Sequence, residues 1–257
     1  MISFCLLGSG SAGNAILVAT DSTQVLIDNG LSYKELSRRV AAMGLSLEGL
    51  SGVLLTHEHG DHCLGVGTLC RKHAVPAYLT RGTHAALPAR IGPLPDARIF
   101  RAGDSWQLGD LEVSSFSVTH DAADPVGYTL SSRGAKVGFA FDLGAPTQLV
   151  RQRLAGSQAL VLETNYCPEM LRFGDYPEQV KQRISSRFGH LSNDSAAGLL
   201  RELAHPTLQT IVLVHISENN NTPARAHAAI SGALEGHAAQ VHLATQDAPT
   251  PLFRVAV

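Results

Sequence analysis

The sequence has 257 residues, of which 44% are hydrophobic and 16% charged, and its formal net charge is −2. This composition is typical of a globular protein and argues against a disordered chain. A net charge near zero excludes bulk attraction to nucleic acid but allows a local basic patch. The four cysteines form no C-x-x-C pair, no apolar run has membrane-spanning length, and the first residues lack a basic leader region. We therefore expect one cytoplasmic domain over residues 1–257, without a membrane partner.

Apolar runs and helical spacing predict the elements in chain order. In the first 144 residues we expect helices at 33–43 and 64–74 and strands at 2–7, 14–19, 24–27, 52–55, 77–79, 98–100, 105–108, 111–119, 126–131 and 136–141. The rest alternates between helices at 146–154, 177–187, 192–204 and 223–234 and strands at 159–163, 211–214 and 240–243. Two halves that each combine strands with outer helices predict an α/β (α+β) fold of packed sheets covered by helices.

Residues 8–13, Gly-Ser-Gly-Ser-Ala-Gly, match the G-x-G-x-x-G pattern of dinucleotide-binding loops, and Asp28 follows at a suitable spacing. That fingerprint requires a helix after the glycines, because the helix N-terminus binds the pyrophosphate. Here a strand-like segment follows instead. We therefore expect a glycine-rich hairpin whose backbone approaches a ligand, with Ser11 or Asn14 as a hydrogen-bonding side chain.

The strongest chemical signal is residues 56–62, Thr-His-Glu-His-Gly-Asp-His, which directly follow a predicted buried strand. In an extended chain His57 and His59 point to the same side, and Asp61 and His62 lie where the next helix should begin. Imidazole and carboxylate ligands together suit zinc or another first-row divalent ion. Four such ligands within six residues are enough to begin two adjacent metal sites.

A site with two metal ions needs ligands from other parts of the chain. His120, Asp142 and His215 each come directly after a predicted apolar strand. Rigid strand ends are positions from which a scaffold presents functional side chains, whereas buried polar groups without partners are costly. We therefore include these three residues in the predicted metal site.

These residues in this order resemble the metal motifs of the metallo-β-lactamase superfamily, over nearly the whole chain. The resemblance implies a four-layer αβ/βα sandwich with a dinuclear site at its edge. It also implies two divalent ions, Zn²⁺ or Mn²⁺. The ligands implied are His57, His59 and His120 for one ion, Asp61, His62 and His215 for the other, and Asp142 as a bridge.

The segments around these ligands resemble phosphodiesterases of the superfamily. Residues 189–196 open a predicted helix and are similar to the accessory histidine motif of ribonuclease Z-type enzymes, which implies that His190 contacts the scissile phosphate or assists the leaving oxygen. Segments 8–14, 120–128, 189–193 and 215–221 look like the WalJ/YycJ-type branch of metal-dependent exonucleases acting on DNA. One departure is Tyr166-Cys167, where this branch is expected to carry His-Asp.

Four further residues are candidates for binding substrate. Arg183 and Arg187 are four positions apart on a predicted helix, where they can face a phosphate backbone or solvent. Asn219, in an Asn-rich run, can bond a phosphate or sugar or belong to an ordinary turn. Asn193, close after His190, is a candidate substrate contact and also a potential helix cap.

These observations predict a phosphodiesterase or nuclease and, by resemblance, a DNA exonuclease, with RNA left open as a substrate. A hydroxide bridging two metal ions would attack phosphorus, Asp61 and Asp142 would hold the ions, and His190 would offset negative charge. A thioesterase or lactonase (glyoxalase II-like) is the alternative, although it gives His190 no use. A non-catalytic regulator would be expected to lack ligands, and His62 argues against a zinc β-lactamase. The sequence indicates no protein partner.

Overall fold

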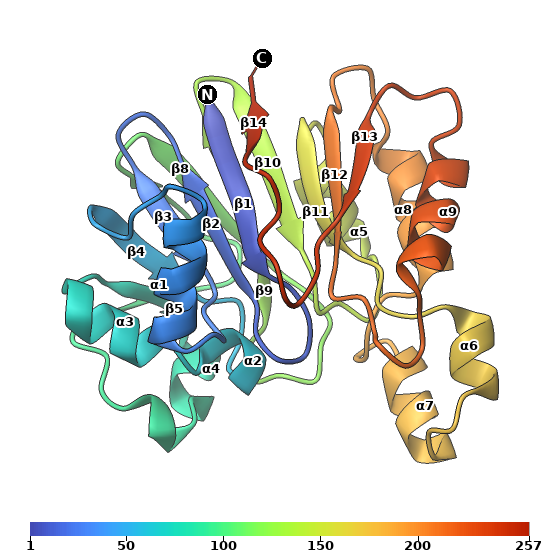
Figure 1. Ribbon diagram of the computed structural model, residues 1–257, viewed down its shortest axis with the longest axis horizontal. Coiled ribbons are helices and arrows are strands. Elements are labelled where there is room, and N and C mark those ends of the chain that lie inside the picture. Colours follow the sequence, from blue (N-terminus) through green and yellow to red (C-terminus); the bar gives the residue numbers. More distant parts are fainter. Residues whose placement is uncertain (257) are drawn as a thin grey trace.

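The computed structural model describes residues 1–256 and contains two seven-stranded sheets that pack face to face (Figure 1). Their strand orders are β14-β1-β2-β3-β4-β5-β6 and β13-β12-β11-β10-β9-β8-β7. The strands are β1 (Ile2–Gly8), β2 (Ala15–Ala19), β3 (Gln24–Ile27), β4 (Leu50–Leu54), β5 (Ala77–Thr80), β6 (Ala97–Phe100), β7 (Ser105–Leu108), β8 (Leu111–Ser117), β9 (Val126–Ser132), β10 (Ala135–Ala140), β11 (Ala159–Glu163), β12 (Thr210–Val214), β13 (Gln240–Leu243) and β14 (Phe253–Val255).

Helices cover the outer faces of both sheets, which confirms the predicted four-layer sandwich. The first sheet is covered by α1 (Tyr33–Ala42) and α3 (Val66–His73), and the second by α5 (Gln148–Leu154), α8 (Asn193–Leu203) and α9 (Pro223–Ala233). Shorter helices in the connections are α2 (Gly60–Cys63), α4 (Arg81–Ala86), α6 (Pro168–Phe173) and α7 (Glu178–Ser185), with a 3-10 turn at Ala89–Ile91. No helix within residues 1–256 has the length and apolar character needed to cross a membrane.

The main apolar core lies between the two sheets, because successive side chains of each strand point to opposite faces. On β1, Phe4 and Leu6 face the second sheet, whereas Cys5 and Leu7 pack under the helices. Phe4 meets Phe139 of β10 edge to face, with ring centroids 6.0 Å apart. This alternation fixes the strand register, so the residues that follow each strand are held in defined positions.

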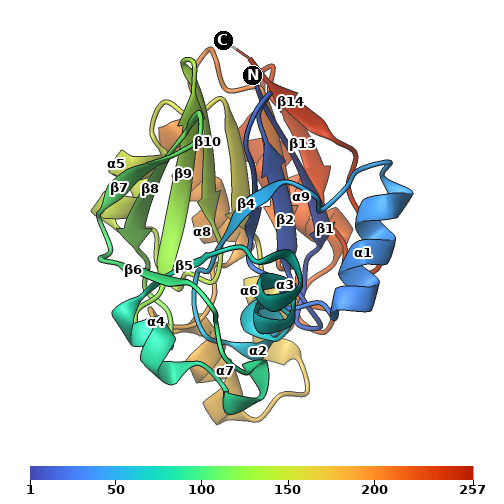
Figure 2. The same ribbon diagram turned by 90° about the vertical axis from the view of Figure 1, so that its left-hand side faces the viewer.

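The sheets are mixed, and their parallel strands end together at one edge of the sandwich. Strands β3 to β6 are parallel neighbours in the first sheet, as are β10 to β13 in the second. The short helices α2, α6 and α7 gather at this lower edge, whereas both chain ends lie at the opposite end (Figures 1 and 2). Loops that follow several strands therefore meet in one place.

The glycine-rich segment is the hairpin that the sequence predicts. Strands β1 and β2 pair antiparallel, and in the loop between them Gly13 N donates to Gly10 O. A strand follows the glycines, so the loop does not have the strand-to-helix geometry of a dinucleotide fingerprint.

Some helix boundaries differ from the prediction. The helix predicted at 64–74 is α3, and the separate short helix α2 before it was not predicted. The helix predicted at 177–187 ends at Ser185, because Ser186 has an extended backbone (φ −72°, ψ 164°). Arg187 is therefore outside the helix, and the prediction that Arg183 and Arg187 share one helical face was wrong. The six-residue helices α4 and α6 and the three-residue strand β14 are too short to produce a clear periodic pattern.

A close backbone contact joins the loop after β3 to the segment after β4. A Cβ on Gly30 would lie 1.8 Å from the backbone oxygen of Asp61, so a side chain there must displace one of the two loops. We expect Gly30→Ala to lower the free energy of unfolding by at least about 2 kcal/mol in urea denaturation.

Gly198→Ala is the matched control. A Cβ on Gly198 would meet no atom within 4 Å, and the residue lies in the interior of α8. This variant should be more stable than the parent by about 0.5–1 kcal/mol, because alanine loses less entropy in a helix. If Gly30→Ala were as stable as Gly198→Ala, the contact would not constrain these loops.

Candidate metal centre

Polar side chains at the ends of six strands meet at the lower edge of the sandwich. They are Asp28 after β3, His57 after β4, His120 after β8, Asp142 after β10, Glu163 at the end of β11 and His215 after β12. Asp28, Asp142 and His215 have left-handed backbone conformations, with φ of 56°, 49° and 54°. That conformation costs a non-glycine residue about 1–2 kcal/mol. Such strain is typical of functional sites.

His57, His59 and His120 form the first cluster of potential ligands. One nitrogen of each ring lies within 4.8 Å of the others. His59 Nδ1 and His120 Nε2 are 3.3 Å apart. The structure thus brings together the three histidines that the sequence analysis assigns to one ion.

Asp61, His62 and His215 form the second cluster, with ligand atoms again within 4.8 Å of one another. Asp61 Oδ2 lies 3.2 Å from His62 Nε2 and 3.5 Å from His215 Nε2. Asp142 Oδ2 is 2.9 Å from His62 Nε2, and Asp142 also groups with His57. Its carboxylate therefore lies between the two clusters.

Fixed acceptors orient three of these imidazole rings. His62 Nδ1 is 2.8 Å from Asp28 Oδ2, His120 Nδ1 is 3.0 Å from Gly189 O, and His57 Nδ1 is 3.0 Å from Thr56 Oγ1. When Nδ1 is engaged in this way, Nε2 is left to bind a metal ion. The sequence analysis missed Asp28 in this role, because it considered the residue only as part of the glycine pattern.

The donor set fits divalent metal ions. Nε2 of His57 and Nε2 of His215 are buried and have no hydrogen-bond partner among the described residues. Burial holds the pKa of His57 well below its ordinary value and also lowers the pKa of His120. The His57 and His120 rings are therefore neutral and offer lone pairs. Since buried polar atoms without partners are costly, and imidazole and carboxylate are suitable ligands, a divalent ion would satisfy the cluster.

His190 lies beside the clusters and is held by a buried carboxylate. Its Nδ1 is 2.7 Å from Glu163 Oε1 and 3.4 Å from Asp142 Oδ1. Glu163 is fully buried and also accepts a bond from Leu143 N. Burial lowers the pKa of His190, but the two carboxylates outweigh this effect and raise its pKa to about 11. The sequence analysis missed Glu163, although an acid at the end of an apolar strand is the signal that identified Asp142.

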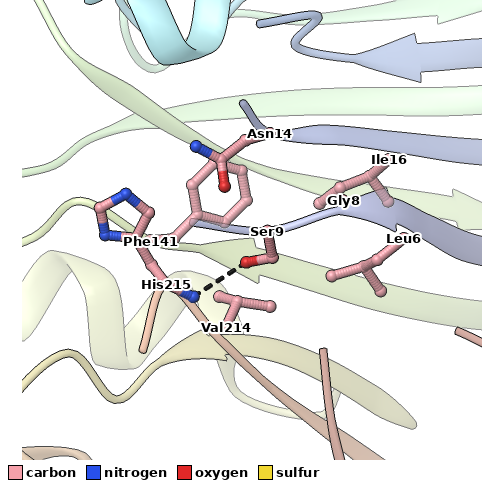
Figure 3. A pocket seen from close by; sticks show the side chains of 8 residues that line it. All are labelled: Leu6, Gly8, Ser9, Asn14, Ile16, Phe141, Val214 and His215. Carbon is pink, nitrogen blue, oxygen red and sulfur yellow. Dashed lines mark hydrogen bonds between the residues drawn. The ribbon is translucent and has the colours of Figure 1, made fainter. Parts of the chain in front are cut away.

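The hairpin loop braces the ligands from the first sheet. Ser9 Oγ accepts a hydrogen bond of 2.9 Å from His215 N (Figure 3). Asn14 is buried, and its Nδ2 lies 3.2 Å from Asp61 Oδ2 and 3.0 Å from His62 Nε2. Ser11, in contrast, is exposed in the same loop.

A small pocket lies between the sheets, next to this hairpin loop. Figure 3 shows Asn14 and His215 at one end of it and the apolar Leu6 and Ile16 at the other. The ligand cluster therefore stands directly on the apolar core, which favours rigid ligand positions.

Three other candidates for substrate contact, Arg183, Arg187 and Asn219, are exposed. Arg183 Nε forms an ion pair of 2.9 Å with Asp121 Oδ2, next to His120. Asn219 is exposed and donates to Tyr176 Oη. Arg187 is exposed in the turn after α7.

Asn193 is buried, and its amide forms reciprocal hydrogen bonds of 3.0 and 2.8 Å with Asn221. These bonds link the loop after β12 to the start of α8. Tyr166 and Cys167, the departure from the branch pattern, are also buried, and their backbone groups bond to Asn193 N and to Asn220 O. These two positions therefore help to join the loops around His190 and His215.

Comparisons with known proteins agree with this geometry. A family model described as "Beta-lactamase superfamily domain" matches residues 23–216. The chain is 37% identical over 257 residues to exodeoxyribonuclease YycJ of Bacillus anthracis, covering 97% of each protein. It is 34% identical over 267 residues to exodeoxyribonuclease WalJ of Streptococcus pneumoniae, covering 98% of this chain and 97% of that protein.

A solved structure shows the same fold at lower identity. The crystal structure of the metallo-beta-lactamase fold protein YhfI from Bacillus subtilis matches with a TM-score of 0.73 at 14% identity. The match covers 97% of this chain and 99% of that chain. The fold, the family match and the two nearly full-length relatives together show that this chain belongs to the metallo-β-lactamase superfamily, in its WalJ/YycJ-type branch.

Proposed function

We propose that this protein is a metal-dependent exonuclease that hydrolyses phosphodiester bonds of DNA. The observation that carries the proposal is His190, which Glu163 holds beside the metal clusters at a position where a bound phosphate could receive its proton. Two relatives named exodeoxyribonucleases, matched over nearly their whole length, support DNA as the substrate. A thioester expels a thiolate, which leaves without a proton at neutral pH, so that reaction would give the proton of His190 less to do.

Two divalent ions, Zn²⁺ or Mn²⁺, complete the proposed site. His57, His59 and His120 would hold one ion, and Asp61, His62 and His215 the other, with Asp142 shared between them. When bound, the ions would make water more acidic and offset charge on the phosphate oxygens.

The side chains perform the remaining steps of the proposed reaction. Asp61 and Asp142 keep the two clusters at a fixed separation. His190, with Nδ1 engaged by Glu163, presents Nε2 to the phosphate and donates a proton to the leaving oxygen. Glu163 is a positioning residue, because it fixes the ring and favours the charged imidazolium.

Removal and return of metal is the direct test of this function. Protein stripped of metal should not shorten end-labelled DNA, and Mn²⁺ or Zn²⁺ should restore shortening, because the ligand set binds no substrate by itself. His59→Ala and His190→Ala should each remove most of the restored activity, and the product ladder should show loss from one end. End-labelled RNA of the same sequence tests the choice of nucleic acid.

The same experiment distinguishes the nuclease from the alternative hydrolase. If the metal-loaded protein left both nucleic acids intact but cleaved an acyl-glutathione thioester, the nuclease proposal would be wrong. The substrate would then be a small thioester or ester.

Asp142→Asn tests the shared ligand. The amide has nearly the same shape but only one good acceptor atom and no charge, so the site should hold the two ions less tightly. We expect turnover on DNA to fall by at least about 100-fold, while the circular dichroism spectrum is unchanged. Near-normal hydrolysis by the folded variant would contradict a bridging role for Asp142.

Asp28→Asn tests the buried acceptor behind His62. Without the carboxylate the His62 ring is less firmly oriented, and we expect metal affinity in equilibrium dialysis to fall by about 10–100-fold. Asp110→Asn is the matched control, because the Asp110 carboxylate bonds to Thr20, and these two residues precede β8 and β3, at the ends of those strands opposite to His120 and Asp28. Equal metal affinity of the two variants would exclude a positioning role for Asp28.

A further inference from the structure

The segment from Pro168 to Gly189, here called the α6–α7 arm, projects from the edge of the sandwich that carries the metal centre (Figures 1 and 2). Leu171 is the only buried residue of α6, and α7 has no buried residue. The arm therefore contributes little to the apolar core, and most of its side chains are exposed.

The arm exposes aromatic side chains that a monomeric protein would usually cover. Phe173 is 73% exposed and Phe188 is 51% exposed. The guanidinium carbon of Arg172 lies 5.3 Å from the centroid of the Phe173 ring, and that of Arg187 lies 5.4 Å from the Phe188 ring. Each exposed ring is thus paired with a positive charge.

This combination is typical of surfaces that bind single-stranded nucleic acid. Bases stack on aromatic rings whatever their sequence, and basic side chains attract the backbone phosphates. Within the arm the basic residues are Arg172, Lys181, Arg183 and Arg187, and the acidic ones are Glu169, Asp175 and Glu178. Glu169 forms an ion pair of 2.6 Å with Arg225, and Arg183 forms one of 2.9 Å with Asp121. Without these two residues, three basic side chains stand against two acidic ones, so the arm keeps a small positive excess.

The C-terminal end of the arm lies next to the proposed metal centre. Gly189 O binds the Nδ1 of His120, and His190 follows directly. Arg183 reaches Asp121, the residue after His120. At its other end α7 contacts α6, where Lys181 Nζ donates to Arg172 O. The eight residues of α7 span about 12 Å, or roughly three base steps at 3.4 Å.

From this arrangement we propose that the α6–α7 arm is a stacking platform for unpaired bases of the DNA strand whose end lies in the metal centre. The inference rests on the proposed nuclease function. Phe173 and Phe188 would stack on bases, and Arg172 and Arg187 would lie close to the phosphates between them. The rings would contact only bases that are unpaired near the strand end, because bases within a duplex have no free faces to stack on the rings.

The test compares DNA binding with the hydrolysis of a substrate too small to reach the arm. Fluorescence anisotropy with a labelled, hydrolysis-resistant phosphorothioate (dT)20 measures the Kd of the metal-loaded protein. Phe173→Ala/Phe188→Ala should raise this Kd by about tenfold or more. Phe173→Trp/Phe188→Trp should retain the parent's affinity. Hydrolysis of thymidine 5′-(p-nitrophenyl phosphate) should be the same in all three proteins.

Leu149→Ala is the matched control, because Leu149 is an exposed apolar residue of α5, outside the arm, and 38% exposed. It should leave the Kd unchanged. An unchanged Kd in the double alanine variant, or an equal loss of mononucleotide hydrolysis, would overturn the proposal. Sedimentation adds a further outcome: if the arm joined two copies of the chain, the alanine variant would dissociate without losing affinity for DNA, and the proposal would be wrong.

Failure of the proposed nuclease function would be recognised separately. If (dT)20 bound through the two phenylalanines but neither substrate was hydrolysed with Mn²⁺ or Zn²⁺, the platform would stand and the nuclease assignment would fail.

Discussion

The carboxylate of Asp28 accepts a bond from His62 Nδ1 at 2.8 Å and further bonds from Thr56 N at 2.8 Å and Thr56 Oγ1 at 2.7 Å. Asp28 is fully buried, and an isolated charge there would cost many kcal/mol. The carboxylate is tolerated only because these partners surround it. The same bonds fix the end of β4, from which His57 follows, and the His62 ring. The loop geometry of the first sheet and the direction of two proposed metal ligands therefore depend on one buried group.

The site concentrates both strain and buried polarity at the edge where the strands end. Left-handed backbone conformations at Asp28, Asp142 and His215 turn the chain sharply after β3, β10 and β12 and direct the side chains to one centre. Each turn costs free energy, and the burial of so many polar groups adds a desolvation cost. The apolar core between the sheets offsets these costs and holds the strand ends still. Part of the free energy gained by the core is thus offset at the strand ends, where the proposed ligands need fixed positions.

Much of the site could be predicted from the sequence because it depends on local rules. The histidine motif follows an apolar strand, and His120, Asp142 and His215 follow others, so strand prediction alone brought them to one edge. Glu163 follows the same rule and could have been found. Asp28 also follows a predicted strand, but its role as the acceptor behind His62 could not be predicted, since it depends on the pairing of β3 with β4 in space.

The arm was poorly predicted for a different physical reason. A helix that buries no side chain does not need an apolar face, so the hydrophobic pattern of the sequence does not define where it ends. The helix α7 therefore ends at Ser185, two residues before the predicted end at residue 187. The exposure of Phe173 and Phe188 is likewise a tertiary property. An apolar residue in a sequence is expected to be inside, and only the structure shows that these two are outside.

The contrast between a rigid centre and an exposed arm agrees with what each is proposed to bind. Metal ions need ligands held within tenths of an ångström, which burial and strand ends provide. A polymer of varying sequence needs contacts that every nucleotide can make, and exposed rings and cations meet that need. With a net charge of −2 the protein as a whole offers DNA little long-range attraction. The proposed binding of DNA would then depend on short-range contacts close to the metal centre, where the arm joins exposed rings and positive charge.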